Sequence, residues 1–251
     1  MIALAPCSPF SVTTSLMRAT ATLAERLNVR LHTHLAETED ENRFCEQTHG
    51  CRPLDYLEQC GWLSARTWLA HGIHFNASEI RRLAQAGTTI SHCACSNQVL
   101  ASGCCPVCDM EAAGVAVGVG VDGSASNDES NLIQEVRAAF LLQRARYGVG
   151  RVGHRDALRW ATLGSAACVG RPELGEIAPG RAADLALFKL DELRFSGHGD
   201  PLAALVLCGA HRADRVMVGG KWLVSGGAID GLDITDLIRR HSAAARAMQA
   251  G

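Results

Sequence analysis

Several features that mark whole classes of protein are missing from this 251-residue chain. Its formal net charge is −2, so it has no positive surplus with which to bind nucleic acid or an anionic membrane. Aromatic residues make up only 5%, too few for a platform on which single-stranded bases stack. No apolar run approaches the roughly 20 residues that cross a bilayer, and the opening residues MIALAPCSPFSVTT lack the regions of a secretory signal. We therefore expect neither a nucleic-acid partner nor a membrane partner.

Cysteine, by contrast, is abundant and odd in number, at 11 residues. The length of the chain and the missing signal favour reduced thiols and a cytoplasmic location over a disulfide framework. Five of these residues form what we call the cysteine group, with the spacing C-x-C…CC-x-x-C, which matches no standard closed zinc site. The group is either a structural zinc cluster or ordinary core packing; its members are Cys93, Cys95, Cys104, Cys105 and Cys108.

The first two thirds of the chain alternate short apolar runs with helical patterns. Strands are predicted at 2–5, 29–37, 67–71, 88–93 and 115–123, and helices at 14–28, 38–48, 53–60, 76–87, 106–114 and 131–148. Asn76 is a plausible N-cap and Gly87 a plausible stop for the helix between them. Alternation of this kind predicts an α/β fold with a parallel sheet, either a (β/α)₈ barrel or a doubly wound sheet.

The last third changes character. Short strands with glycine turns are predicted within 174–191, 202–209, 213–220 and 221–227, followed by a closing helix at 233–249. This pattern is typical of a small β module. We therefore predict two domains, one over residues 1–170 and one over residues 171–251.

Chemically active side chains fall where successive predicted strands end. His34 and Glu37 lie at the carboxyl end of the second predicted strand, and His71, His92 and Asp122 lie at the carboxyl ends of the next three. Imidazole and carboxylate are zinc ligands, and in parallel α/β folds the carboxyl ends of strands carry the active site. Each residue also has a purely structural interpretation, in which the histidines pack at strand ends and the aspartate caps a helix. Four such strand ends in succession favour a catalytic metal site.

These residues carry a family resemblance. The segments HTHLAET, WLAHGIH, SHCACSN, ASGCCPV and GVGVDGSASND…EVR resemble the amidohydrolase superfamily, in its branch of zinc aminohydrolases acting on purines and triazines. ALAPCSPFSV, GVDGSASND and DPLAALV are most similar to the 8-oxoguanine deaminases, a group also labelled hydroxyatrazine-type amidohydrolases. The resemblance covers essentially the whole chain. It implies strands four to eight of a (β/α)₈ TIM barrel, then the C-terminal part of a small β-sandwich and a terminal helix.

The resemblance also implies residue roles. His34 and Asp122 would bind the metal, which is Zn²⁺ or alternatively Fe²⁺. Glu37 would protonate a ring nitrogen of the substrate, Asp122 would take a proton from the attacking water, and His71 would steady the attacking group. Cys7, His92 and Asn97 would line the pocket or lie just behind it, whereas His32 is expected to be structural.

The implied reaction is zinc-dependent hydrolytic deamination of an oxidised purine, with 8-oxoguanine yielding urate and ammonia. The alternatives are a hydroxyatrazine- or guanine-type aminohydrolase and a non-catalytic truncated chain. Family members are commonly oligomeric, so a homo-oligomer is possible.

One part of the family pattern is absent. The family pattern begins with an H-x-H pair on the first barrel strand, and both of its histidines bind zinc. In this chain no histidine precedes His32. The sequence therefore reads as the C-terminal part of a longer enzyme. We expect it to bind zinc poorly on its own, with two ligands, or three with His71, and not to turn over substrate.

Overall fold

The computed structural model describes residues 2–250, which divide into two compact units. The first unit comprises residues 2–181 together with Gly197–His211, and the second comprises Ala182–Ser196 together with residues 212–250. None of the helices in the described range is long and apolar enough to cross a membrane.

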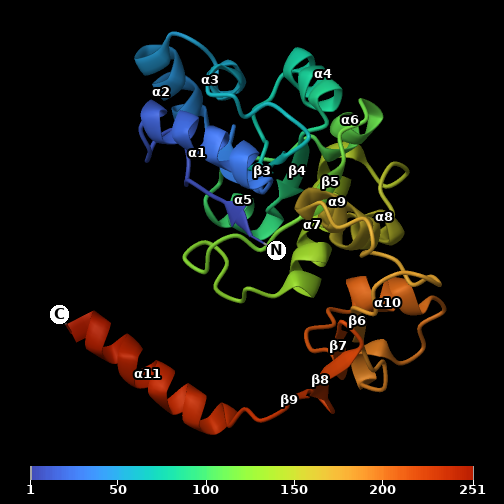
Figure 1. Ribbon diagram of the computed structural model, residues 1–251. Helices are drawn as coiled ribbons and strands as arrows, with labels where there is room; N and C mark the ends of the chain where they lie inside the picture. Colours follow the sequence, from blue (N-terminus) through green and yellow to red (C-terminus); the bar gives the residue numbers. More distant parts are fainter. Residues whose placement is uncertain (1, 251) are drawn as a thin grey trace. The chain divides into compact units, whose positions relative to one another are not determined.

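The first unit is built on a five-stranded parallel sheet in the order β1-β2-β3-β4-β5. Its strands are β1 (Ala3–Leu4), β2 (Arg30–Leu35), β3 (Thr67–His71), β4 (Thr89–His92) and β5 (Val117–Val119). Spatial order equals chain order, and every connection carries at least one helix (Figure 1). The predicted α/β fold with a parallel sheet is confirmed.

The helices of this unit lie between and after the strands (Figure 1). They are α1 (Thr14–Leu27), α2 (Glu39–His49), α3 (Pro53–Gln59), α4 (Ala77–Ala86), α5 (Ala94–Val99), α6 (Val107–Ala112), α7 (Leu132–Tyr147), α8 (His154–Arg159), α9 (Ser165–Val169) and α10 (Pro201–Leu207). A π-helical turn, η1 (Trp160–Gly164), joins α8 to α9. It lies so close to β5 that a Cβ on Gly164 would be 2.0 Å from the Val117 carbonyl oxygen, so this position requires glycine.

Strand β2 shows how the sheet sorts its side chains. Its burial alternates along the strand, with Leu31, Thr33 and Leu35 buried and His32 and His34 only partly so. Side chains of a strand alternate between faces, so the two histidines share one face.

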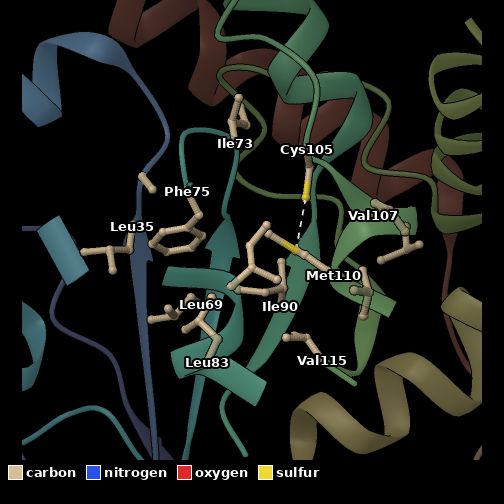
Figure 2. Close-up of a cluster of buried hydrophobic side chains, with 14 of the residues drawn as sticks. Leu35, Leu69, Ile73, Phe75, Leu83, Ile90, Cys105, Val107, Met110 and Val115 are labelled. Atoms are coloured by element: carbon tan, nitrogen blue, oxygen red, sulfur yellow. Dashed lines mark hydrogen bonds between the residues drawn. The ribbon is translucent and has the colours of Figure 1, made fainter. Parts of the chain in front are cut away.

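The apolar core of the first unit lies between the sheet and its helices. Figure 2 shows part of it, where side chains from three strands, from helices α4 and α6 and from the connecting loops pack together; those labelled are Leu35, Leu69, Ile73, Phe75, Leu83, Ile90, Cys105, Val107, Met110 and Val115. Burial of this apolar surface is the main force that holds the helices to the sheet.

The second unit contains a four-stranded antiparallel sheet, β6-β7-β8-β9. Its strands are β6 (Leu185–Leu187), β7 (Arg215–Val218), β8 (Lys221–Ser225) and β9 (Ala228–Ile229), with a 3₁₀ turn, η2 (Leu193–Phe195), after β6. The final helix, α11 (Ile234–Ala250), has no buried residue. The predicted strands at 213–220 and 221–227 are confirmed as β7 and β8.

The strand predicted at 202–209 is wrong, because these residues form helix α10 within the first unit. The Asp200 carboxylate accepts hydrogen bonds from the amides of Leu202 (2.8 Å) and Ala203 (3.2 Å), and Pro201 occupies the first helical position. Asp-Pro is a strong helix start, and a short apolar run alone cannot distinguish strand from helix.

Candidate metal centre

Three side chains from different strand ends meet at one point of the parallel sheet. His34 is the second-last residue of β2, His71 is the last residue of β3, and Asp122 lies three residues after β5. Each offers a ligand atom, and these atoms all lie within 4.8 Å of one another. Within residues 2–250, no other group of three or more histidine, cysteine or carboxylate side chains is arranged in this way. We call these residues the strand-end group.

The His34 ring is held from behind by the loop after β1. Its Nδ1 donates to the carbonyl oxygen of Cys7 at 2.6 Å, so Nε2 points away, 3.5 Å from Asp122 Oδ1. The same carbonyl accepts the His34 backbone N–H at 3.0 Å and the Thr33 hydroxyl at 2.9 Å. The contact that Cys7 makes with His34 is therefore chiefly through its backbone, while its thiol lies 3.9 Å from the ring nitrogen.

The His71 ring is held in the same manner. It is 1% exposed, and its Nδ1 donates to the amide oxygen of Asn97 in α5 at 2.8 Å. Its Nε2 then lies 3.7 Å from Asp122 Oδ2 and 3.6 Å from Glu37 Oε2. Asn97, predicted to lie in or behind the pocket, thus contacts the back of a strand-end histidine.

Asp122 is supported by two serines that the sequence reasoning missed. The Ser96 hydroxyl donates to Asp122 Oδ2 at 2.7 Å, and Ser126 Oγ lies 3.5 Å from the same oxygen. Ser96 immediately precedes Asn97 in the SHCACSN segment. Its position next to the predicted Asn97 is the feature of the sequence that could have identified Ser96 as a site residue.

The backbone at this site is unusual. His71 has φ 70° and Asp122 has φ 61°, both in the left-handed region that side-chain-bearing residues rarely adopt. Each such residue costs on the order of 1–3 kcal/mol, and such positions concentrate at functional sites. The packing around both strand ends therefore maintains a conformation that local preference disfavours.

The electrostatics of the group favour a cation. The Asp122 carboxylate raises the pKa of His34 to about 9 against the opposing effect of burial, and the imidazole in turn lowers the pKa of Asp122. In this arrangement a proton on His34 balances the aspartate charge. A metal cation would replace that proton, so its binding would release one.

The donor set fits a divalent metal ion. Two imidazole nitrogens and a carboxylate oxygen converge, and three protein ligands with one open position are typical of catalytic zinc sites. Each ring also places its Nδ1–H on an oxygen acceptor, the second-layer arrangement that fixes the tautomer of metal-binding histidines.

Glu37 lies beside this group without belonging to it. It follows β2 by two residues, and its side chain is 24% exposed. Only one of its contacts, to His71, reaches the strand-end group. That position leaves its carboxyl group open to a bound molecule.

Two other predicted histidines do not belong to the strand-end group. His92 is fully buried, and its Nε2 accepts from Gln143 Nε2 in α7 at 3.2 Å, while burial lowers its pKa to about 3. His32 stacks on Trp68, with ring centroids 4.6 Å apart, and its Nδ1 donates to the Trp68 carbonyl at 3.1 Å. His32 therefore has structural contacts, as expected, and His92 is a neutral core histidine in contact with Gln143.

The cysteine group does not converge on a common point that would hold a metal. All 11 cysteines are free thiols. The Cys105 thiol lies in the apolar core, 3.8 Å from the sulfur of Met110 (Figure 2). Core packing therefore accounts for this residue better than metal binding does.

A separate groove lies at the opposite, amino ends of β2 and β3. It encloses about 590 Å³ and is lined by Ile2, Asn28, Val29, Arg30, Ala65, Arg66, Val169 and Gly170. It shares no residue with the strand-end group, and its two arginines already donate to backbone carbonyls. We assign no chemistry to it.

Comparison with known proteins decides the family. Residues 1–223 match the model of the amidohydrolase family. The chain belongs to this family. The predicted resemblance is thereby confirmed, as is an α/β fold of the TIM-barrel type among its structural neighbours.

Individual relatives are also similar over nearly the whole chain. An 8-oxoguanine deaminase of Pseudomonas aeruginosa is 65% identical over 250 residues, which is 100% of this chain and 56% of the relative. Hydroxydechloroatrazine ethylaminohydrolase of a Pseudomonas species is 38% identical, over 95% of this chain and 50% of the relative. A zinc-bound adenosine deaminase structure from Xanthomonas campestris matches with a TM-score of 0.95 at 29% identity, covering 99% of this chain and 57% of that one. The chain spans about half the length of the relatives it matches.

Proposed function

We propose that this chain carries the metal-binding and proton-transfer residues of a hydrolytic deaminase that converts 8-oxoguanine to urate and ammonia. The observation that carries the proposal is the convergence of His34, His71 and Asp122, with Glu37 beside them. The 65% identity to a protein named 8-oxoguanine deaminase supports the choice of substrate.

The same proposal interprets the architecture. The five parallel strands would be strands four to eight of a (β/α)₈ barrel, and the antiparallel sheet would be part of a β-sandwich. The site at the carboxyl ends of β2, β3 and β5 supports this interpretation, since barrel enzymes build their active sites at that end.

The metal would be zinc, held by His34 and Asp122 with His71 within reach. When bound, it would supply a hydroxide nucleophile at neutral pH. The protein residues would do the rest. Asp122 Oδ2, close to His71, would take the proton from the attacking water. His71, whose Nδ1–H is held by Asn97, would direct its unprotonated Nε2 at the site and accept a hydrogen bond from the attacking water.

Glu37 would act as the general acid. Its partly exposed carboxyl would protonate a ring nitrogen of the purine, so that negative charge does not accumulate on the ring as the amino-bearing carbon is attacked. A proton transfer of this kind contributes about 10²–10⁴ in rate. The proton held by Asp122 would then leave with the amine as ammonia.

The test measures ammonia release from 8-oxoguanine, guanine, isoguanine and hydroxyatrazine. Two proteins are compared: the 251-residue chain, and the chain extended by whatever its reading frame encodes upstream. We expect 8-oxoguanine to be the best substrate of the extended protein and Glu37→Gln to lower its kcat about 10²–10⁴-fold. Glu39→Gln is the matched control, because Glu39 is exposed and pairs with His74 at 2.8 Å instead.

A second candidate substrate is a hydroxylated triazine, because the 38% identical relative is named for that chemistry. Preference for hydroxyatrazine would favour it over 8-oxoguanine. If no form of the protein released ammonia from any of the four compounds, the chain would be better described as non-catalytic.

A further inference from the structure

Glu41 is a buried carboxylate that the proposed mechanism does not use. It is 2% exposed and lies in the first turn of α2, where its own amide donates to the Thr38 side chain at 3.2 Å. Burial raises its pKa to about 7. A buried acidic group without a specific partner would be costly, so its contacts identify its role.

Both oxygens of Glu41 reach back to the turn that leaves β2. Oε1 accepts the Ala36 amide at 3.0 Å, and Oε2 accepts the Glu37 amide at 2.9 Å. Ala36 has φ 53°, a left-handed conformation that alanine disfavours. Two hydrogen bonds to a carboxylate, each stronger than one between neutral groups, hold the turn in that shape.

The carbonyl side of the same turn is also fixed. The Ala36 oxygen accepts the amides of Ile73 at 2.8 Å and His74 at 2.9 Å, just beyond His71. Glu41 and the segment after β3 thus hold the turn from both sides. The residue that the turn delivers is Glu37, whose Oε2 lies 3.6 Å from His71 Nε2.

Glu79 shows what an ordinary glutamate does at the corresponding place in α4. It is also 2% exposed and in the first turn, but its carboxylate accepts the amide of its own N-cap, Asn76, at 2.8 Å. Arg52 neutralises it through contacts of 2.8 and 3.0 Å. Within residues 2–250, Glu41 has no ion-pair partner comparable to the Arg52 of Glu79. Its carboxylate binds the turn that carries Glu37 instead of the cap of its own helix.

We infer that Glu41 is a positioning residue, whose carboxylate fixes the turn that aims Glu37 into the active site. This inference rests on the proposed role of Glu37. If the inference holds, loss of the Glu41 carboxylate disturbs the conformation of the turn after β2 and leaves helix α2 intact.

The first readout needs no catalytic activity. Amide hydrogen exchange is compared in the 251-residue chain and in Glu41→Gln, Glu41→Asp and the control Glu79→Gln. We expect the amides of Ala36 and Glu37 to exchange at least about 10-fold faster in both Glu41 variants, and to be unchanged in Glu79→Gln. Protection of these two amides at the parent level in a folded Glu41 variant would overturn the inference. Glu41→Asp retains the charge, so it provides the measurement if Glu41→Gln does not fold.

The second readout separates positioning from mere stability. In the extended protein, Glu41→Gln should lower kcat about 10–100-fold while KM stays within about twofold, since a misplaced acid slows chemistry more than binding. Glu79→Gln should leave both constants unchanged. Equal losses in the two variants would contradict the inference. If no form of the protein is active, the proposed function fails, and the exchange data alone decide the role of Glu41.

Discussion

The strand-end group and the cysteine group consist of residues of the kind that bind metals, and both belong to the first unit, yet only one has the geometry to do so. The strand-end residues converge within 4.8 Å, with each histidine ring fixed by an oxygen acceptor. The cysteines include a fully buried thiol packed against a methionine. Residue type alone therefore does not predict a metal site; convergence at adjacent strand ends does.

The two groups also differ in protonation. Asp122 is ionised and raises the pKa of its histidine partner, so the strand-end group already favours a positive charge. Burial raises the pKa of Cys95 to about 12 and that of Cys105 well above its usual value. The metal-free cysteine group therefore consists of neutral thiols, and unlike the strand-end group it carries no charge that would favour a cation.

Removing a strand-end ligand is the strongest way to test the comparison. We expect Asp122→Asn and His34→Ala each to weaken Zn²⁺ binding by more than about 100-fold, because loss of an outer partner alone costs about 10–100-fold. Affinity is measured by competition with a chromophoric chelator. Cys105→Ala is the control and should keep the parent affinity. An equal loss in all three variants would refute the distinction between the groups.

Loss of an outer partner should have a smaller effect. Asn97→Ala removes the acceptor of the His71 Nδ1–H, so the ring loses its fixed tautomer. Zinc affinity should fall about 10–100-fold, by the same competition assay. Unchanged affinity in a folded Asn97→Ala chain would mean that His71 is not a ligand.

In the cysteine group we expect an effect on stability alone. Cys105→Ala removes a buried sulfur that contacts Met110, and should lower the free energy of unfolding by about 1–2 kcal/mol. Urea denaturation would show this as a lower midpoint with an unchanged slope. A loss of metal binding in this variant, without unfolding, would count against our assignment.

The smallest expected effect is the response of buried thiols to pH. A thiol with a pKa of about 12, such as Cys95, is only about 0.1% thiolate at pH 9. Raising the pH from 7 to 9 should therefore produce little alkylation of Cys95 or Cys105 by iodoacetamide in the folded chain. Mass spectrometry would show full labelling after urea, and labelling of the exposed Cys7 before it. Rapid labelling of Cys105 in the folded chain would contradict its burial.

Much of this comparison was predictable from local sequence. The strand at Thr67–His71 and the helix between Asn76 and Gly87 have the predicted bounds, because β-rich apolar residues and strong caps are local signals. His34, His71 and Asp122 were each predicted at a strand end. Parallel strands that follow one another in the sheet bring such ends together.

Other roles could not be predicted from local sequence, because they depend on contacts that only the folded chain shows. Ser96 is an ordinary residue in its local segment, and its role appears only when Asp122, from the segment after β5, is placed beside it. Glu41 binds amides only four and five residues before it, but its place in the first turn of a helix equally fits a glutamate that caps its own helix, as Glu79 does. Helix α10 was missed for the opposite reason, because its apolar run concealed the Asp200-Pro201 start.

The most direct test of the account is the visible absorption spectrum of the chain with excess Co²⁺, a spectroscopic substitute for zinc. Nitrogen and oxygen ligands predict d–d bands alone, lost in His34→Ala and retained in Cys105→Ala. Intense thiolate-to-cobalt charge-transfer bands that survive His34→Ala and disappear in the cysteine variant would contradict it.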